Sequence, residues 1–201
     1  MKHPNLSVIA LALVISACGS GGKSDGSTPP PTTTLQVCES MGGAGVTVSE
    51  TARCTGCSST DVAKAADEDV ASNSVVVAAF SLGGQPISIR ATNPARRFTA
   101  GKKAGVYLTY PSGSGGSASV TSLTTTVATY LDGGLQESAS ASSSSSTLTR
   151  QQVQTGASDY PETFAYFTTT KPFDAVEVRI SNAGTSNASL KIYELCGNGS
   201  P

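Results

Sequence analysis

The 201-residue chain contains no tryptophan, a single histidine at His3, and only 13% charged residues. This low charge excludes a coiled coil and a charge-rich disordered chain. The 13 basic and 14 acidic residues are nearly balanced, so the chain lacks the electrostatic footprint of a nucleic-acid binder. In place of charge it has 30 Ser, 24 Thr and 21 Gly residues. This composition suits a β protein with many turns better than a helical one.

Long hydrophobic runs are also missing from the sequence. The longest, residues 6–15, is broken only by Ser7 and follows Lys2 and His3. It is too short to cross about 30 Å of hydrocarbon as a mature membrane helix. A short basic start followed by such a run is typical of an export signal, which we expect over residues 1–17. No later stretch approaches about 18 apolar residues, so the sequence predicts no transmembrane helix.

The expected export signal closes with Ile15-Ser16-Ala17-Cys18. This segment resembles the lipobox of bacterial lipoproteins. The resemblance implies a diacylglyceryl group on the Cys18 sulfur, cleavage before Cys18, and acylation of the new amino group by a fatty acid such as palmitate. Two or more acyl chains anchor a protein firmly, whereas one anchors it only marginally. Gly19, where Asp would imply retention in the inner membrane, implies a lipid anchor in the outer membrane. The alternative is an ordinary secretory signal with a chance cysteine.

Cleavage before Cys18 would remove Lys2 and the only histidine, which leaves 12 basic and 14 acidic residues. Without histidine, the mature chain has neither Ser-His-Asp nor Cys-His catalysis, nor a histidine metal ligand. Paired carboxylates can hydrolyse glycosides, but nothing in the sequence places two of them at the required separation. We therefore expect a protein that is not an enzyme.

Residues 19–34 are rich in Gly, Ser, Pro and Thr and offer no apolar side chain to bury. Gly and Ser make such a segment flexible, and the three prolines at positions 29–31 favour an extended form. We expect a disordered tether over residues 18–34, beginning at the lipidated cysteine. The folded domain then spans residues 35–201, which is long enough to bury a substantial core.

Four cysteines remain in this domain: Cys38, Cys54, Cys57 and Cys196. An even number in an exported protein predicts two disulfides, with three connectivities open. We favour one bridge from Cys38 to Cys54 or Cys57, and one from this segment to Cys196. A redox or zinc role for the C-x-x-C motif at 54–57 is the alternative, but the sequence shows no second pair, histidine or βαβ pattern to support it.

Short alternating or β-branched segments, bounded by turn residues, recur along the domain. Strands are expected at residues 75–80, 87–90, 106–110, 123–131, 163–168, 176–180 and 190–195. Seven or more such strands predict an all-β fold, an antiparallel two-sheet β-sandwich. The one helical candidate is residues 60–69. The Ser-rich segments 112–119 and 138–147 predict mobile loops, with an exposed Ser-rich edge strand as the alternative.

Three groups of residues are candidates for binding. Asp67 and Asp69 lie two positions apart and could offer carboxylate oxygens to a structural calcium ion, although a solvated acidic turn is the alternative. Arg96 and Arg97 lie in a basic loop that could grip a sulfate, a carboxylate or an acidic sugar, or could simply be solvated. Tyr160 is the tyrosine we expect to be most exposed, and a tyrosine ring can stack on a sugar.

Several pieces of the domain, taken in order, resemble jelly-roll domains of the galactose-binding-like type found in bacterial surface and adhesin-like proteins. They are Arg53-Cys54-Thr55-Gly56-Cys57, Ala66-Asp67-Glu68-Asp69, residues 126–133, residues 171–178 and Ile192-Tyr193. The chain departs from the pattern at Glu68, where Gly would complete an Asp-Gly-Asp turn. The resemblance implies two antiparallel sheets and a binding or adhesive role, without a known catalytic set. Together with the expected lipid anchor and tether, it leads us to expect a surface protein that binds a carbohydrate or matrix component in adhesion or capture. The alternative is a structural lipoprotein that contacts another envelope protein.

Overall fold

The computed structural model describes residues 38–78, 85–110, 122–142, 144–153, 161–184 and 186–199. The chain divides into two units, Met1–Thr34 and Leu35–Pro201, and all described residues belong to the second. The expected export signal, Cys18, the tether, Tyr160 and the expected loop 112–119 lie outside the described residues. Within the described part of the chain, no helix is long and apolar enough to cross a membrane.

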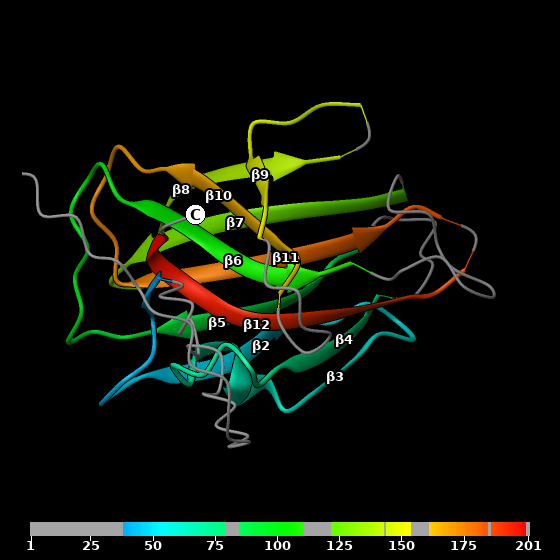
Figure 1. Cartoon of the computed structure of the whole chain (residues 1–201), viewed down its shortest axis with the longest axis horizontal. Coiled ribbons are helices and arrows are strands. Elements are labelled where there is room, and N and C mark those ends of the chain that lie inside the picture. The colour runs from blue at the N-terminus through cyan, green and yellow to red at the C-terminus, as the bar shows by residue number, and fades with distance from the viewer. Residues whose placement is uncertain are drawn as a thin grey trace, which may run out of the picture. The chain divides into compact units, whose positions relative to one another are not determined.

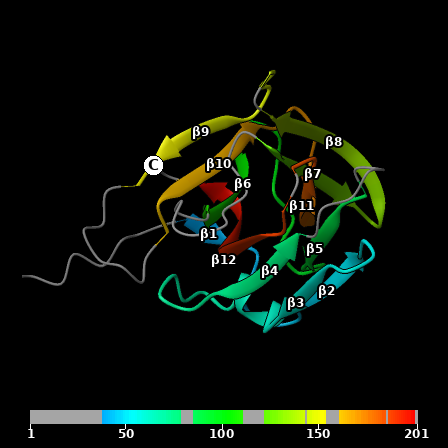
Figure 2. The same cartoon turned by 90° about the vertical axis from the view of Figure 1, so that its right-hand side faces the viewer.

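The fold is all-β and consists of two antiparallel sheets packed face to face, as the end-on view in Figure 2 shows. The larger sheet has the order β3 (Ser58–Thr60), β4 (Ser74–Ala78), β12 (Ala188–Gly199), β6 (Lys103–Thr109), β10 (Thr163–Thr168) and β9 (Thr149–Gln152) (Figure 1). A short strand, β1 (Cys38–Ser40), also pairs with β12 and is labelled in Figure 2. The five-stranded sheet has the order β2 (Thr47–Ala52), β5 (Ile87–Thr92), β11 (Ala175–Asn182), β7 (Leu123–Leu131) and β8 (Gly134–Ala141). The predicted antiparallel β-sandwich is confirmed.

Eight of these strands follow a jelly-roll arrangement. In the larger sheet the order β4-β12-β6-β10 faces the order β5-β11-β7-β8 in the other sheet. The chain therefore passes repeatedly from one sheet to the other as it runs from β4 to β12. This crossing brings strands distant in sequence side by side, so that β11 lies between β5 and β7. Two packed sheets joined in this way define the jelly roll.

The core forms where alternating side chains of the two sheets meet. On β11, Val176, Val178 and Ile180 are buried in the core, so the residues between them face outward. The larger sheet contributes Val106 and Leu108 from β6, and other strands do the same. Alternation between apolar and polar residues thus fixes which face of each strand is buried.

The strands missed by the sequence analysis are short or poor in apolar residues. These are β1, β2, β3, β8 and β9. The loop prediction for residues 138–147 is wrong over its first part, because β8 runs to Ala141 and forms an edge of the five-stranded sheet. Ala139 and Ala141 pack into the core, which holds this Ser-rich segment in a strand. The alternative of a Ser-rich edge strand is therefore correct there.

The expected helix at 60–69 is only a five-residue 3₁₀ helix, Val62–Ala66. Ala65 and Ala66 are its buried residues, so little apolar surface supports a longer helix. Beyond it, the side chain of Asp67 accepts a hydrogen bond from the backbone N–H of Asp69 at 3.0 Å. Asp side chains that bond to nearby backbone in this way favour turns over helix.

Two disulfides use all four cysteines of the domain, as predicted, but the favoured pairing is wrong. Cys38 pairs with Cys196, with Cα atoms 5.8 Å apart, and Cys54 pairs with Cys57 at 5.2 Å. The first pairing follows from the sheet, because β1 runs antiparallel to the end of β12. The second follows from a turn in which the N–H of Cys57 donates to the carbonyl of Cys54 at 3.0 Å. Gly56, with φ of 79°, allows that turn.

Candidate functional site

The outward side of the five-stranded sheet is lined mainly by hydroxyl groups, and we call it the hydroxyl face. Strand alternation and register place nine Ser and Thr side chains there: Thr47, Ser49, Ser88, Thr92, Thr124, Thr126, Ser138, Ser140 and Ser181. Thr51, at the bulge of β2, is the tenth, because its hydroxyl lies 3.0 Å from that of Ser88. Some of them bond to each other across strands, as Thr126 and Ser140 do at 2.7 Å. A hydroxyl both donates and accepts hydrogen bonds, so this face can match a partner rich in hydroxyl groups.

A carboxylate held between two guanidinium groups lies at the centre of the hydroxyl face. Glu177 of β11 lies directly across from Arg90 of β5. Glu177 is only 2% exposed. Nε of Arg90 donates to Oε2 of Glu177 at 2.6 Å. Nε of Arg179, two residues further along β11, donates to Oε1 of the same carboxylate. Each carboxylate oxygen of Glu177 therefore accepts a hydrogen bond from a different arginine.

Tyr130 of β7 holds both arginines from the neighbouring strand. The guanidinium carbon of Arg90 lies 3.6 Å from the centre of the Tyr130 ring, within the range of a cation–π contact. Nη2 of Arg179 donates to the Tyr130 hydroxyl. Tyr130 itself is buried and packs with Ala128 and Ala175 in a small apolar cluster on this face. The two cations are therefore fixed from several sides.

The charge state of this cluster follows from its contacts. Burial works to raise the pKa of Glu177, but the hydrogen bonds and charges of Arg179 and Arg90 outweigh it, and the pKa lies below the ordinary value. For Arg179, burial works to lower the pKa, but the hydrogen bond and charge of Glu177 raise it overall. Glu177 and Arg179 are therefore ionised at neutral pH. Together with the permanent charge of the second guanidinium, the cluster holds two positive charges and one negative.

The predicted basic site lies elsewhere, in the loop between β5 and β6. Nη1 of Arg96 donates to the carbonyl of Ser40 at 2.7 Å, and its Nη2 lies 3.4 Å from Oε1 of Glu68. Nη2 of Arg97 lies 2.6 Å from Oδ1 of Asp132. Both arginine side chains are exposed, at 43% and 58%, but each already has an acidic partner of its own.

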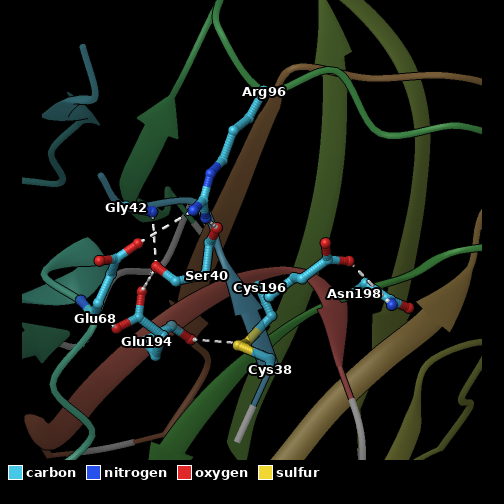
Figure 3. Close-up of a disulfide and its surroundings, with 9 residues drawn as sticks. Cys38, Ser40, Gly42, Glu68, Arg96, Glu194, Cys196 and Asn198 are labelled. Carbon is cyan, nitrogen blue, oxygen red and sulfur yellow. Dashed lines mark hydrogen bonds and ion pairs between the residues drawn. A yellow bond between two sulfur atoms is a disulfide. The ribbon is translucent and has the colours of Figure 1, made fainter. Parts of the chain in front are cut away.

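Arg96 belongs to a junction beside the Cys38–Cys196 disulfide, shown in Figure 3. There Ser40 donates to Oε1 of Glu194, and the N–H of Glu68 donates to Oε2 at 3.1 Å. Glu194 is 1% exposed. Burial raises its pKa to about 8; the Ser40 and Glu68 hydrogen bonds oppose this, and the charges of Asp67 and Glu68 add to it. The junction fastens β1 and the 3₁₀ segment to β12.

The candidate calcium ligands are occupied by local contacts. Asp67 accepts from the N–H of Asp69 at 3.0 Å and from the hydroxyl of Ser72 at 2.6 Å. Asp69 accepts from the N–H of Ala71 at 2.9 Å. Across the described ranges, no group of three or more His, Cys, Asp or Glu residues is arranged to hold a metal ion.

The central residues of the hydroxyl face were not among the site residues predicted from sequence. The alternation of residues 176–180 does place Glu177 and Arg179 on the polar side of their strand. Their partner Arg90, however, lies 87 positions from Glu177, and only the register of β5 against β11 brings the two together. Single-strand patterns carry no signal for that register.

Comparison with known protein families, curated proteins and solved structures gives no match in any of the three.

Proposed function

We propose that this chain is a bacterial envelope lipoprotein, anchored through acylated Cys18, whose β-sandwich captures an extracellular glycan without transforming it. The Ile15-Ser16-Ala17-Cys18 segment and the Gly/Ser/Pro/Thr-rich stretch that follows support the anchor and the tether. Gly19 supports the outer membrane as its location. The jelly-roll strand order supports a relation to galactose-binding-like domains of bacterial surface proteins.

The hydroxyl face is the observation that carries the binding role. It offers nine Ser and Thr hydroxyls on one sheet surface, because Ser88, the tenth, is only 1% exposed, and they surround the fixed cluster of Arg90, Glu177, Arg179 and Tyr130. Sugars present many hydroxyl groups, and each can pair with a Ser or Thr hydroxyl as donor or acceptor. Placing the cluster on strands rather than loops keeps its geometry rigid.

A glycan array probed with the detergent-solubilised full chain, with and without calcium, tests the proposal. We expect binding to a restricted set of glycans. Ser138→Trp, which covers part of the hydroxyl face, should weaken that binding about tenfold. Ser189→Trp is the matched control, because Ser189 is an exposed serine on β12 of the other sheet. Absence of binding to any glycan in either condition would contradict the proposal.

A second candidate function, assembly with another envelope protein, has one observation in its favour. Leu135 is 57% exposed and is the one large hydrophobic side chain exposed among the described residues. It lies on β8, an edge strand that pairs only with β7 in the five-stranded sheet. Crosslinking in intact cells separates the two functions, since a single stoichiometric protein partner that is lost in Leu135→Asp would favour assembly.

A further inference from the structure

We infer that the glycan bound by the hydroxyl face carries an acidic group, and that Arg90 and Arg179 form the clamp for that group. This inference rests on the proposed function and adds to it the chemical class of the ligand. It also places the contact at two named side chains in the centre of the sheet.

The charge of the hydroxyl face supports an anionic ligand. Among the outward-facing residues of the five described strands, only Arg90, Glu177 and Arg179 are charged. The others include the ten hydroxyl residues, Ala52, Ala128, Ala175, Tyr130 and Leu135. One carboxylate therefore faces two guanidinium groups, and the face keeps a positive charge that one acidic group would balance.

The arginines also keep hydrogen-bond donors for a ligand. A guanidinium carries five N–H donors. Arg90 uses Nε and Nη2 on Glu177, while Arg179 uses Nε on Glu177 and Nη2 on Tyr130. Within the part of the chain that the structure describes, the Nη1 groups of both arginines have no partner. The two side chains are 24% and 38% exposed, so they reach the solvent.

The cluster is organised before any ligand arrives. A free arginine side chain loses considerable rotamer freedom when it binds a carboxylate. Here Glu177 holds one end of each guanidinium, and Tyr130 holds Arg90 through its ring and Arg179 through its hydroxyl. The ordering cost is therefore already met in the folded protein, which favours affinity.

The neighbours of the clamp favour a sugar as the carrier of the acidic group. Ser49 lies opposite Arg90 on β2, and Thr126 lies opposite Arg179 on β7. A carboxylate or sulfate held by the arginines would bring adjacent ring hydroxyls over these side chains. A uronate and a sulfated sugar share this chemistry, so the experiment must distinguish them.

Calorimetric titration of the detergent-solubilised full chain compares matched pairs of ligands. One pair is an oligogalacturonate and its methyl ester, and the other is sulfated and unsulfated dextran oligosaccharides. We expect one acidic member to bind at least about tenfold more tightly than its neutral counterpart, as charge-assisted pairs do. Equal affinity within both pairs would overturn the clamp but leave glycan capture standing. Absence of binding to glycans of any kind would overturn both proposals.

Variants locate the clamp on the sheet. Arg179→Gln should weaken binding of the acidic ligand at least about tenfold. Arg179→Lys keeps the charge but loses the planar fork, so its affinity should lie between those of the wild-type chain and Arg179→Gln. Arg150→Gln removes the same charge from an exposed position on β9 of the larger sheet and should change affinity less than twofold. An equal loss in Arg150→Gln, or none in a folded Arg179→Gln, would overturn the assignment. The comparison of neutral and acidic ligands uses the unaltered chain, so it decides the question even where a variant fails to fold.

Discussion

Ser40 on β1 donates a hydrogen bond to Glu194 on β12, although the two residues lie 154 positions apart in the chain. This bond joins the two strands. Glu194 is buried beside the Cys38–Cys196 disulfide, and its pKa is raised to about 8. The folded state therefore keeps a proton on this carboxyl that the unfolded chain releases near pH 4.5. Stability linked to this proton is fully present below that pH and is lost as pH rises through 8.

Glu194→Gln should abolish this pH dependence. The free energy of unfolding of the wild-type chain should fall between pH 5 and pH 8, by an amount on the order of a few kcal/mol. Gln cannot titrate, so the variant should have a nearly flat profile over this range, apart from a constant offset. Denaturant unfolding at several pH values measures it, with exposed Glu162→Gln as the control that keeps the wild-type slope. An unchanged slope in Glu194→Gln would show that this carboxyl is not the group responsible.

Glu177→Gln should destabilise the fold in the opposite pH range. The pKa of Glu177 is lowered, so its contribution is present above the ordinary carboxyl pKa and is lost as pH falls through the folded value. At pH 7 the substitution should cost about 2 kcal/mol, because it removes charged hydrogen bonds to Arg90 and Arg179. The difference from wild type should shrink toward pH 3. A gap of constant size between pH 7 and pH 3 would contradict the ionised cluster.

The two disulfides should contribute unequally to stability. Cys38–Cys196 closes a separation of 158 residues, and Cys54–Cys57 one of 3. On the chain-entropy model these loops correspond to about 5 and about 2 kcal/mol. Replacing both cysteines of each pair by Ser and measuring unfolding by denaturant should show the larger loss for the Cys38–Cys196 pair. Equal losses would mean that restriction of the unfolded chain is not the main source of the stability that each disulfide contributes.

Gly197 on β12 lies against the ring of Phe98, which anchors the loop between β5 and β6. A Cβ atom at position 197 would fall inside contact distance of that ring. Phe98 is buried and stacks on Phe173 with ring centroids 5.2 Å apart, so it cannot easily move. Gly197→Ala should therefore cost about 2 kcal/mol through overpacking. Gly134→Ala is the control, because its nearest contact would be 3.4 Å, and a similar loss there would contradict this explanation.

Alternation within single strands made much of the sandwich predictable. β7 and β10 have the expected bounds, 123–131 and 163–168, because each is rich in β-branched or aromatic residues. β8 was missed because its Ser-rich half has little apolar area of its own. Ala139 and Ala141 hold it in place only after the opposite sheet is present, and one strand's sequence does not contain that information.

The pairings between distant segments could not be predicted in the same way. The Cys38–Cys196 bridge depends on β1 running beside the end of β12. The contact of Arg90 with Glu177 depends likewise on the register of β5 against β11. Both are set by the jelly-roll path, whose strand order follows from the packing of the two sheets. Residue types alone identified the cysteines, but neither their partners nor the central arginines.

Metabolic labelling of intact cells with a palmitate analogue tests the lipid anchor, on which the proposed presentation of the sandwich outside the cytoplasm depends. The wild-type chain should incorporate the label, and Cys18→Ala should not, because Cys18 is the residue whose sulfur and new amino group the acyl chains would modify. Both proteins should be recovered from cells in comparable amounts for the comparison to hold. Failure of the wild-type chain to take up the label, or equal labelling of Cys18→Ala, would contradict the lipoprotein assignment.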